Sequence, residues 1–191
     1  MSQIAIDIAI LLPPKVAEAA ISFSDLLCQK YGERMHLNTT DCLPHISLVM
    51  GVVLESDLED VNRIVAEAKM KFLPLELEIT GVKSTKNSTS LEIERTLELE
   101  ELQEDLLNKL TPFLSYEPTE EMFAEAPEPK ALSWVAEFHS NSTGENFKPH
   151  ITIGPASEYE TYDGPLTFKG SELAICQLGN YCSCKKLLAT I

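Results

Sequence analysis

The sequence predicts an α+β fold built on antiparallel strands. Segments with the two-residue period of strands alternate with three amphipathic helical segments, and the last part of the chain has the pattern of strands alone. Two of the strand segments are separated only by a short polar turn, as in a hairpin. This order lacks the regular strand–helix–strand repeats that build a parallel sheet. The 191 residues, 44% of them hydrophobic, are enough to bury a sizeable core.

The first segments predict a strand followed by a helix. Isoleucines alternate with smaller residues from Ile4 to Ile10, which is the period of a strand. Pro14 suits the first turn of a helix and Gly32 suits a C-terminal cap. Apolar residues recur between them at spacings of three and four, so we predict a helix over 15–31.

The next two elements are a second strand and a second helix. The segment PHISLVMGVVL is apolar and rich in strand-forming residues. Ser56 and Glu59 have the spacing of a capping box, in which two side chains satisfy the free backbone groups of a helix start. An apolar helical face follows them, and it predicts a helix over 57–71.

A hairpin and a third helix come next. The alternating segments LELEITGVK and SLEIERTL flank a polar turn at Lys86-Asn87-Ser88. Leucines on one helical stripe predict a helix over 98–114. The stretch 115–129 is rich in proline and glutamate and is expected to be a surface loop.

The C-terminal part of the chain predicts strands. Residues 131–139 fit a short helix or a strand, because their aromatic and apolar residues suit either. The segments PHITIG, PLTFKG, ELAICQLGNY and CSCKKLLAT then predict four strands. No glycine-rich signature of a nucleotide-phosphate loop occurs anywhere in the sequence.

Composition excludes several classes of protein. With 15 basic and 30 acidic side chains, the net charge of −15 argues against a protein that tracks along duplex DNA or long RNA. No apolar run reaches the roughly 18 residues of a membrane span. The N-terminus lacks the features of a signal peptide, so we expect a cytoplasmic protein with no membrane partner, acting as a monomer.

The five cysteines indicate reduced thiols, because their number is odd and no secretory signal is seen. Cys182 and Cys184 are expected to lie on one face of a strand. A metal site would need further cysteine or histidine ligands at suitable spacing, and the sequence shows none nearby. We therefore predict no metal site and no cofactor.

One short motif occurs twice. Pro44-His45-Ile46-Ser47-Leu48 returns as Pro149-His150-Ile151-Thr152-Ile153, more than half of the chain later. Alternate residues of a strand share a face, about 6.5–7 Å apart along the chain. Each copy therefore presents a histidine and a hydroxyl together, while the residues between them face a core. If the two copies converge, two imidazoles and two hydroxyls line one cleft.

Such a cleft suits acid–base chemistry on a phosphate. The pKa of histidine lies near neutral pH, so one ring can accept a proton from water while the other donates one to a leaving oxygen. Each transfer contributes on the order of 10²–10⁴ in rate. The hydroxyls can donate hydrogen bonds to the non-bridging oxygens of a phosphoryl group. His45 and His150 are therefore candidate catalytic residues, and Ser47 and Thr152 are candidate phosphate ligands.

The two H-x-[ST]-x copies, with hydrophobic residues at the x positions, resemble the motifs of the two-histidine (2H) phosphoesterase superfamily. The segment from Asn141 through Phe147 and the turn Leu178-Gly179-Asn180-Tyr181 are also similar to bacterial members. These members include the RNA 2′,3′-cyclic phosphodiesterases, historically called 2′-5′ RNA ligases. The resemblance implies one bilobal domain over 1–191. Its two pseudo-symmetric antiparallel sheets would carry helices on their outer faces and both histidines at the floor of a central cleft.

The resemblance also implies an activity in RNA processing. One histidine would activate water and the other would protonate the leaving 3′-oxygen, so that a 2′,3′-cyclic phosphate on an RNA end or small nucleotide becomes a 2′-phosphate. The near symmetry of the motifs leaves the acid and the base unassigned, and a reversible ligase activity stays open. Lys148 and Tyr181 are candidate substrate contacts. Basic residues near the motifs are few, which favours a small or terminal cyclic phosphate over long RNA; they are Arg34, Lys148, Lys185 and Lys186.

Two other functions remain open. The same pocket could bind a phosphate or cyclic nucleotide without turnover, or serve an RNA-repair accessory protein. A metal hydrolase would have to use the four histidines, whose spacing shows no ligand pattern. His36 and His139 lack a hydroxyl partner and are expected on the surface or in packing. Trp134 and Phe147 are expected in the core or the cleft wall.

Overall fold

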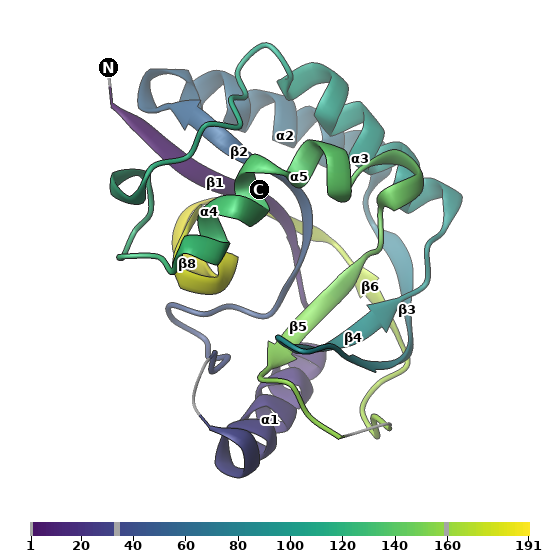
Figure 1. Cartoon of the computed structure of the whole chain (residues 1–191). Helices are drawn as coiled ribbons and strands as arrows, with labels where there is room; N and C mark the ends of the chain where they lie inside the picture. Colours follow the sequence, from purple (N-terminus) through teal and green to yellow (C-terminus); the bar gives the residue numbers. More distant parts are fainter. Residues whose placement is uncertain (1, 33–34, 159–160) are drawn as a thin grey trace.

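The structure is a computed structural model that describes residues 2–32, 35–158 and 161–191. Its elements follow the α+β order that the sequence predicts (Figure 1). The strands are β1 (Gln3–Leu11), β2 (His45–Leu54), β3 (Leu75–Ser84), β4 (Thr89–Ile93), β5 (His150–Gly154), β6 (Thr167–Gly170), β7 (Glu172–Leu178) and β8 (Cys184–Thr190). The α-helices are α1 (Pro14–Tyr31), α2 (Leu58–Phe72), α3 (Leu97–Leu110), α4 (Pro129–Ala136) and α5 (Phe138–Asn141). Short 3₁₀ turns are η1 (Glu55–Asp57), η2 (Glu120–Met122), η3 (Gly144–Asn146) and η4 (Asn180–Cys182).

The strands form two four-stranded antiparallel sheets. Their orders are β2-β1-β7-β8 and β5-β4-β3-β6. The first sheet takes strands from both ends of the chain, so a lobe does not correspond to one half of the sequence. The two motif strands, β2 and β5, each lie at the edge of their sheet, and they contact one another. The two copies of the repeated motif therefore meet where the two sheets adjoin.

Helices cover the sheets and close the core. In Figure 1, α2 and α3 run side by side along one side of the molecule, and α1 lies at the opposite end. Helix α1 contacts β5, α2 contacts β7, and α3 contacts β2. One hydrophobic cluster joins these helices to strands of both sheets. The helices predicted over 15–31 and 57–71 and the predicted hairpin are confirmed.

Strand β1 is buried on both faces, although its alternating pattern suggests a strand with one apolar face. Ile6, Ile8 and Ile10 are almost fully buried in the main cluster. The other face carries Ala5 and Asp7, which are also fully buried. Small residues suit this second face because α4 and the turn η4 contribute to a second apolar cluster directly over it. A single carboxylate is thus enclosed in the middle of the molecule.

Three local expectations need correction. The capping box at Ser56 is wrong, because Ser56 lies inside η1 and donates to Asp57 instead. The third helix ends at Leu110 rather than near residue 114, which lets Ser115 bridge to β2. Residues 131–139, for which strand and helix were both open, fall in α4 and the start of α5.

The expectation of reduced thiols is wrong for two of the cysteines. Cys176 and Cys184 form a disulfide between the adjacent antiparallel strands β7 and β8, where their Cα atoms are 5.3 Å apart. Cys182 lies in η4 rather than on a strand, so the C-x-C pair does not share a strand face. Cys28, Cys42 and Cys182 are free thiols. Within the described residues, none of the helices combines the length and apolarity needed to cross a bilayer.

A β-bulge shapes the first motif. Val49 of β2 pairs with Ile8 and Ser47 pairs with Ala9, so Leu48 is an extra residue between the two pairs. A bulge leaves backbone groups outside the ladder and redirects neighbouring side chains. The buried side chain of Gln103 in α3 donates from its Nε2 to the carbonyl of Leu48 at 2.9 Å and to that of Ser142 at 3.0 Å. One amide therefore satisfies the bulge and ties it to the segment after α5.

We predict that Gln103→Leu lowers the free energy of unfolding by about 1–3 kcal/mol, because the buried carbonyl of Leu48 loses its donor and the half-buried carbonyl of Ser142 loses a second hydrogen bond. Urea denaturation followed by circular dichroism measures this change. Glu104→Leu, which makes the same replacement at the exposed neighbouring position, should change stability by no more than about 0.5 kcal/mol. Equal effects of the two changes would contradict the role of Gln103.

Candidate active site

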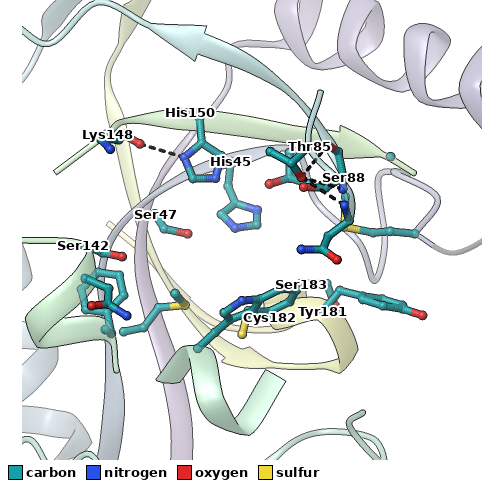
Figure 2. A pocket seen from close by; sticks show the side chains of 18 of the residues that line it. His45, Ser47, Thr85, Ser88, Ser142, Lys148, His150, Tyr181, Cys182 and Ser183 are labelled. Atoms are coloured by element: carbon teal, nitrogen blue, oxygen red, sulfur yellow. Dashed lines mark hydrogen bonds between the residues drawn. The ribbon is translucent and has the colours of Figure 1, made fainter. Parts of the chain in front are cut away.

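The two motifs open into one cavity of about 420 Å³. His45, Ser47, His150 and Thr152 all line it, and so do Lys148 and Tyr181, so the structure brings together every predicted site residue. The four motif side chains come from β2 and β5, whose first residues are the two histidines. Figure 2 shows the two imidazoles on one side of the cavity, with Tyr181, Cys182 and Ser183 across from them.

Both histidine rings are held by the same backbone device. Nδ1 of His45 lies 2.7 Å from the carbonyl oxygen of Leu43, and Nδ1 of His150 lies 2.8 Å from that of Lys148. A carbonyl oxygen only accepts, so Nδ1 must carry the proton in each ring. The Nε2 atoms are therefore the ones left to exchange protons with a ligand. The repeat extends from sequence to hydrogen bonding, because each histidine uses the carbonyl two residues before it.

The surroundings of the two rings differ because of Asp7, which sequence reasoning did not select. Its carboxylate lies on β1 and is fully buried. Its Oδ2 atom accepts a 2.6 Å hydrogen bond from the hydroxyl of Ser47 and lies 3.4 Å from Nε2 of His45. Its Oδ1 atom has no hydrogen-bond partner among the described residues. No comparable acid contacts His150 in that part of the chain.

This difference separates the pKa values of the two histidines. Burial alone would lower the pKa of His45, whose side chain is only 14% exposed, but the Asp7 carboxylate outweighs it and raises that pKa above its usual value. Reduced hydration within the cleft lowers the pKa of His150, and the charge of His45 adds to the effect. Burial raises the pKa of Asp7, against the opposing influence of His45 and Ser47. At neutral pH the proton is therefore favoured on Nε2 of His45, and His150 is favoured in its neutral form.

The remaining predicted residues lie in the cavity wall. Thr152 has no side-chain hydrogen bond within the described part of the protein, so its hydroxyl can serve a ligand. Lys148 is exposed at the cavity, and its carbonyl oxygen accepts a hydrogen bond from His150. The hydroxyl of Tyr181 donates to Glu128 at 2.8 Å, and its backbone has a positive φ of 57°. Trp134 and Phe147 line the cavity, as expected of cleft-wall residues.

Basic residues contribute little to this cavity. Lys185 forms ion pairs of 2.9 Å with both Asp41 and Glu125, and neither Lys185 nor Lys186 lines the cavity. Arg34, the fourth basic candidate, lies outside the described residues. Among the described lining residues other than the histidines, Lys148 and Glu137 carry the charged side chains. The wall is otherwise neutral, with polar and apolar side chains side by side.

Besides the buried Asp7, which does not line the cavity, sequence reasoning did not place two sets of residues in its wall. The β3–β4 turn supplies Thr85, Asn87 and Ser88, and the segment around α5 supplies Asn141, Ser142 and Asn146. The sequence marked 141–147 by its resemblance and 86–88 as a turn, but only the fold brings these loops to the motifs. Asp7 did leave a signal, since it is the one charge within an otherwise apolar strand. The two other histidines lie outside the cavity: His36 contacts Asp25, and His139 packs on Tyr116.

A metal centre has no obvious ligand set in this structure. In the described ranges, no group of three or more histidine, cysteine, aspartate or glutamate side chains is arranged to hold a metal ion. The cavity itself presents two imidazoles together with hydroxyl and amide groups.

The chain matches the model of a known family. The family is described as the 2′-5′ RNA ligase superfamily, and the match covers residues 13–163. That region contains both motifs complete. A comparison with curated proteins found no match.

Solved structures share the fold at low sequence identity. The protein TT0787 of Thermus thermophilus superposes with a TM-score of 0.61 at 16% identity, over 98% of this chain and 97% of that chain. E. coli LigT complexed with phosphate gives a TM-score of 0.58 at 14% identity, over 100% of this chain and 98% of that chain. E. coli LigT complexed with NADP⁺ gives 0.58 at 12% identity, with the same coverage of each chain. The arrangement of two antiparallel sheets with helices is thus a known fold.

We predict that the neutral form of His150 carries its proton on Nδ1, because the Lys148 carbonyl accepts from that atom. Two-bond and three-bond ¹H–¹⁵N correlation spectra of protein labelled at histidine distinguish the two tautomers directly. His150→Ala identifies the signal, and His139, whose ring packs on Tyr116 outside the cavity, gives the comparison. A proton on Nε2 of neutral His150 would contradict this geometry.

Proposed function

The chain belongs to the 2′-5′ RNA ligase superfamily of two-histidine phosphoesterases, and from this premise we propose that it opens 2′,3′-cyclic phosphates to 2′-phosphates. One observation carries the proposal: two imidazoles with oppositely shifted pKa values share one cavity with the hydroxyl of Thr152. Such a pair can deliver and remove protons in a single step.

The geometry suggests how the step proceeds. Nε2 of neutral His150 accepts a proton from water as the water oxygen bonds to phosphorus. The bond between phosphorus and the 3′-oxygen breaks, and Nε2 of protonated His45 gives its proton to that oxygen. The 2′-phosphate and a free 3′-hydroxyl are the products. The hydroxyl of Thr152 donates to a non-bridging oxygen, where negative charge is concentrated in the transition state.

Size and charge of the cavity favour a small substrate. A volume of about 420 Å³ lies within the roughly 300–1,000 Å³ typical of small-ligand sites. With Lys148 as the basic residue of the described lining apart from the histidines, the cavity offers few phosphate contacts along a polynucleotide. E. coli LigT, which has the same fold, has been crystallised with phosphate, with NADP⁺ and with 3′-AMP. We therefore propose a nucleotide or a terminal RNA nucleotide as the substrate.

Water as nucleophile gives hydrolysis, and a 5′-hydroxyl in its place would give ligation. Both reactions use the two histidines in the same roles, because either nucleophile gives its proton to the base while the acid protonates the leaving 3′-oxygen. The cavity is open to water, whose concentration exceeds that of any RNA end. We therefore propose hydrolysis as the activity of this protein in the cytoplasm, with ring opening by a 5′-hydroxyl as a competing reaction.

We predict that the purified protein hydrolyses nucleoside 2′,3′-cyclic monophosphates in the presence of EDTA. His45→Ala and His150→Ala should each lower kcat by on the order of 10²–10⁴, because each removes one proton transfer. His36→Ala is the matched control, since this exposed histidine lies outside the cavity and should leave kcat unchanged. Phosphorus NMR of the product identifies the 2′-phosphate.

Two outcomes would exclude this function. If both alanine variants keep the wild-type rate, the histidines do not carry the reaction. If the cyclic nucleotide binds in calorimetry but gives no product after long incubation, the cavity belongs to a binding module rather than an enzyme.

We predict a bell-shaped dependence of kcat/KM on pH, with a plateau wider than two ordinary histidines would give. His150 must be neutral, so activity falls as pH drops through its pKa, which is lowered. His45 must be protonated, so activity falls as pH rises through its pKa, which is raised. Steady-state assays across the pH range measure both limbs. A basic limb below the usual pKa of histidine would contradict the raised pKa of His45.

A further inference from the structure

We propose that Asp7 is a positioning residue that holds the proton on Nε2 of His45 and engages the hydroxyl of Ser47, so that Thr152, rather than Ser47, is the hydroxyl that binds phosphate. The inference rests on the proposed function and assigns unequal tasks to two motifs that are nearly identical in sequence.

The position of Asp7 makes its charge consequential. It lies in the middle of β1, opposite Met50 of β2 and Cys176 of β7, and no part of it reaches solvent. A carboxylate buried in this way is costly unless an opposite charge or several hydrogen bonds compensate it. Its contacts are the Ser47 hydroxyl at 2.6 Å and Nε2 of His45 at 3.4 Å. A protonated His45 supplies the compensating charge.

The hydroxyl of Ser47 can donate only once. A serine has a single O–H proton, and the Asp7 carboxylate takes it as acceptor. Ser47 then presents lone pairs to the cavity, and lone pairs repel a phosphoryl oxygen. Thr152 occupies the corresponding place on β5, and its hydroxyl has no acceptor in the described part of the chain. The anion is therefore held from the Thr152 side.

The titratable groups around Asp7 and His45 come from several elements. The charges of His45 on β2 and of His150 on β5 both act to lower the pKa of Asp7. Burial raises the pKa of the Cys182 thiol in η4, and the charge of Asp7 raises it further. The charge of Lys83 on β3 helps to lower the pKa of His150. Asp7 is the acid in direct contact with either imidazole among the described residues. Removal of the Asp7 charge should thus change the pKa of His45 more than the pKa of His150.

The proposal can be tested first without substrate. In ¹⁵N spectra of histidine-labelled wild-type protein, both ring nitrogens of His45 should be protonated at neutral pH, and infrared spectra should show the Asp7 carboxylate as an anion. A neutral His45 ring beside a protonated Asp7 would overturn the proposal, whatever the activity.

The second arm uses Asp7→Asn with Asp25→Asn as its control, because Asp25 is the partner of the exposed His36 outside the cavity. Loss of the Asp7 charge should move the basic limb of the kcat/KM profile to lower pH and lower the rate on the basic side by on the order of tenfold or more. Asp25→Asn should leave the profile unchanged. An unshifted basic limb in folded Asp7→Asn would refute the role of Asp7.

The third arm compares Ser47→Ala with Thr152→Val and does not depend on the folding of Asp7→Asn. Competitive inhibition by inorganic phosphate should weaken by on the order of tenfold in Thr152→Val, as expected for a lost hydrogen bond to a charged group, and by less than about threefold in Ser47→Ala. Equal weakening in the two variants would show that both hydroxyls bind phosphate. The proposed function fails separately, through an unaffected rate in His45→Ala.

Discussion

The approach of β2 to β5 is the constraint on which the site depends. Each strand is the edge of its sheet, and each begins with a histidine whose ring is fixed by the carbonyl two residues before it. Edge strands have one side free of ladder partners, so side chains and preceding loops can be placed there without disrupting the sheet. The contact of these two edges is what turns two separate strand motifs into one cavity.

Near symmetry of sequence does not produce symmetry of chemistry here. A proton donor and a proton acceptor must be in opposite protonation states, and a difference in pKa makes one such arrangement of the two rings dominant. The difference comes from β1, which carries the buried Asp7 beside His45. The acid opposite His150 in the ladder is Glu92 of β4, which is exposed and forms an ion pair with Lys83. The third residue of each motif is affected as well, since Ser47 is already engaged with Asp7.

Polar groups buried around the first motif would destabilise the fold if they lacked hydrogen-bond partners, and specific side chains supply those partners. The bulge at Leu48 is satisfied by Gln103, which also binds the segment leading to the second motif. Arg95 makes a similar connection, because its guanidinium donates to the carbonyls of Gly144, Glu145 and Phe147. Helix α3 and the residues just before it thus support the loop that leads into β5. Side chains remote from the cavity hold its two walls in register.

The sequence alone determined the elements and the reactive pair. Periodicity placed the strand from Ile4 to Ile10, the helices over 15–31 and 57–71 and the hairpin, because hydrophobic spacing directly reflects which face is buried. The repeat identified His45 and His150 as a pair, since residue type and strand spacing place each beside a hydroxyl. Only the tertiary structure decided which ring has a carboxylate beside it. That depends on Asp7, distant in sequence and adjacent in space, because burial and electrostatic contact are properties of the packed chain and not of any local segment.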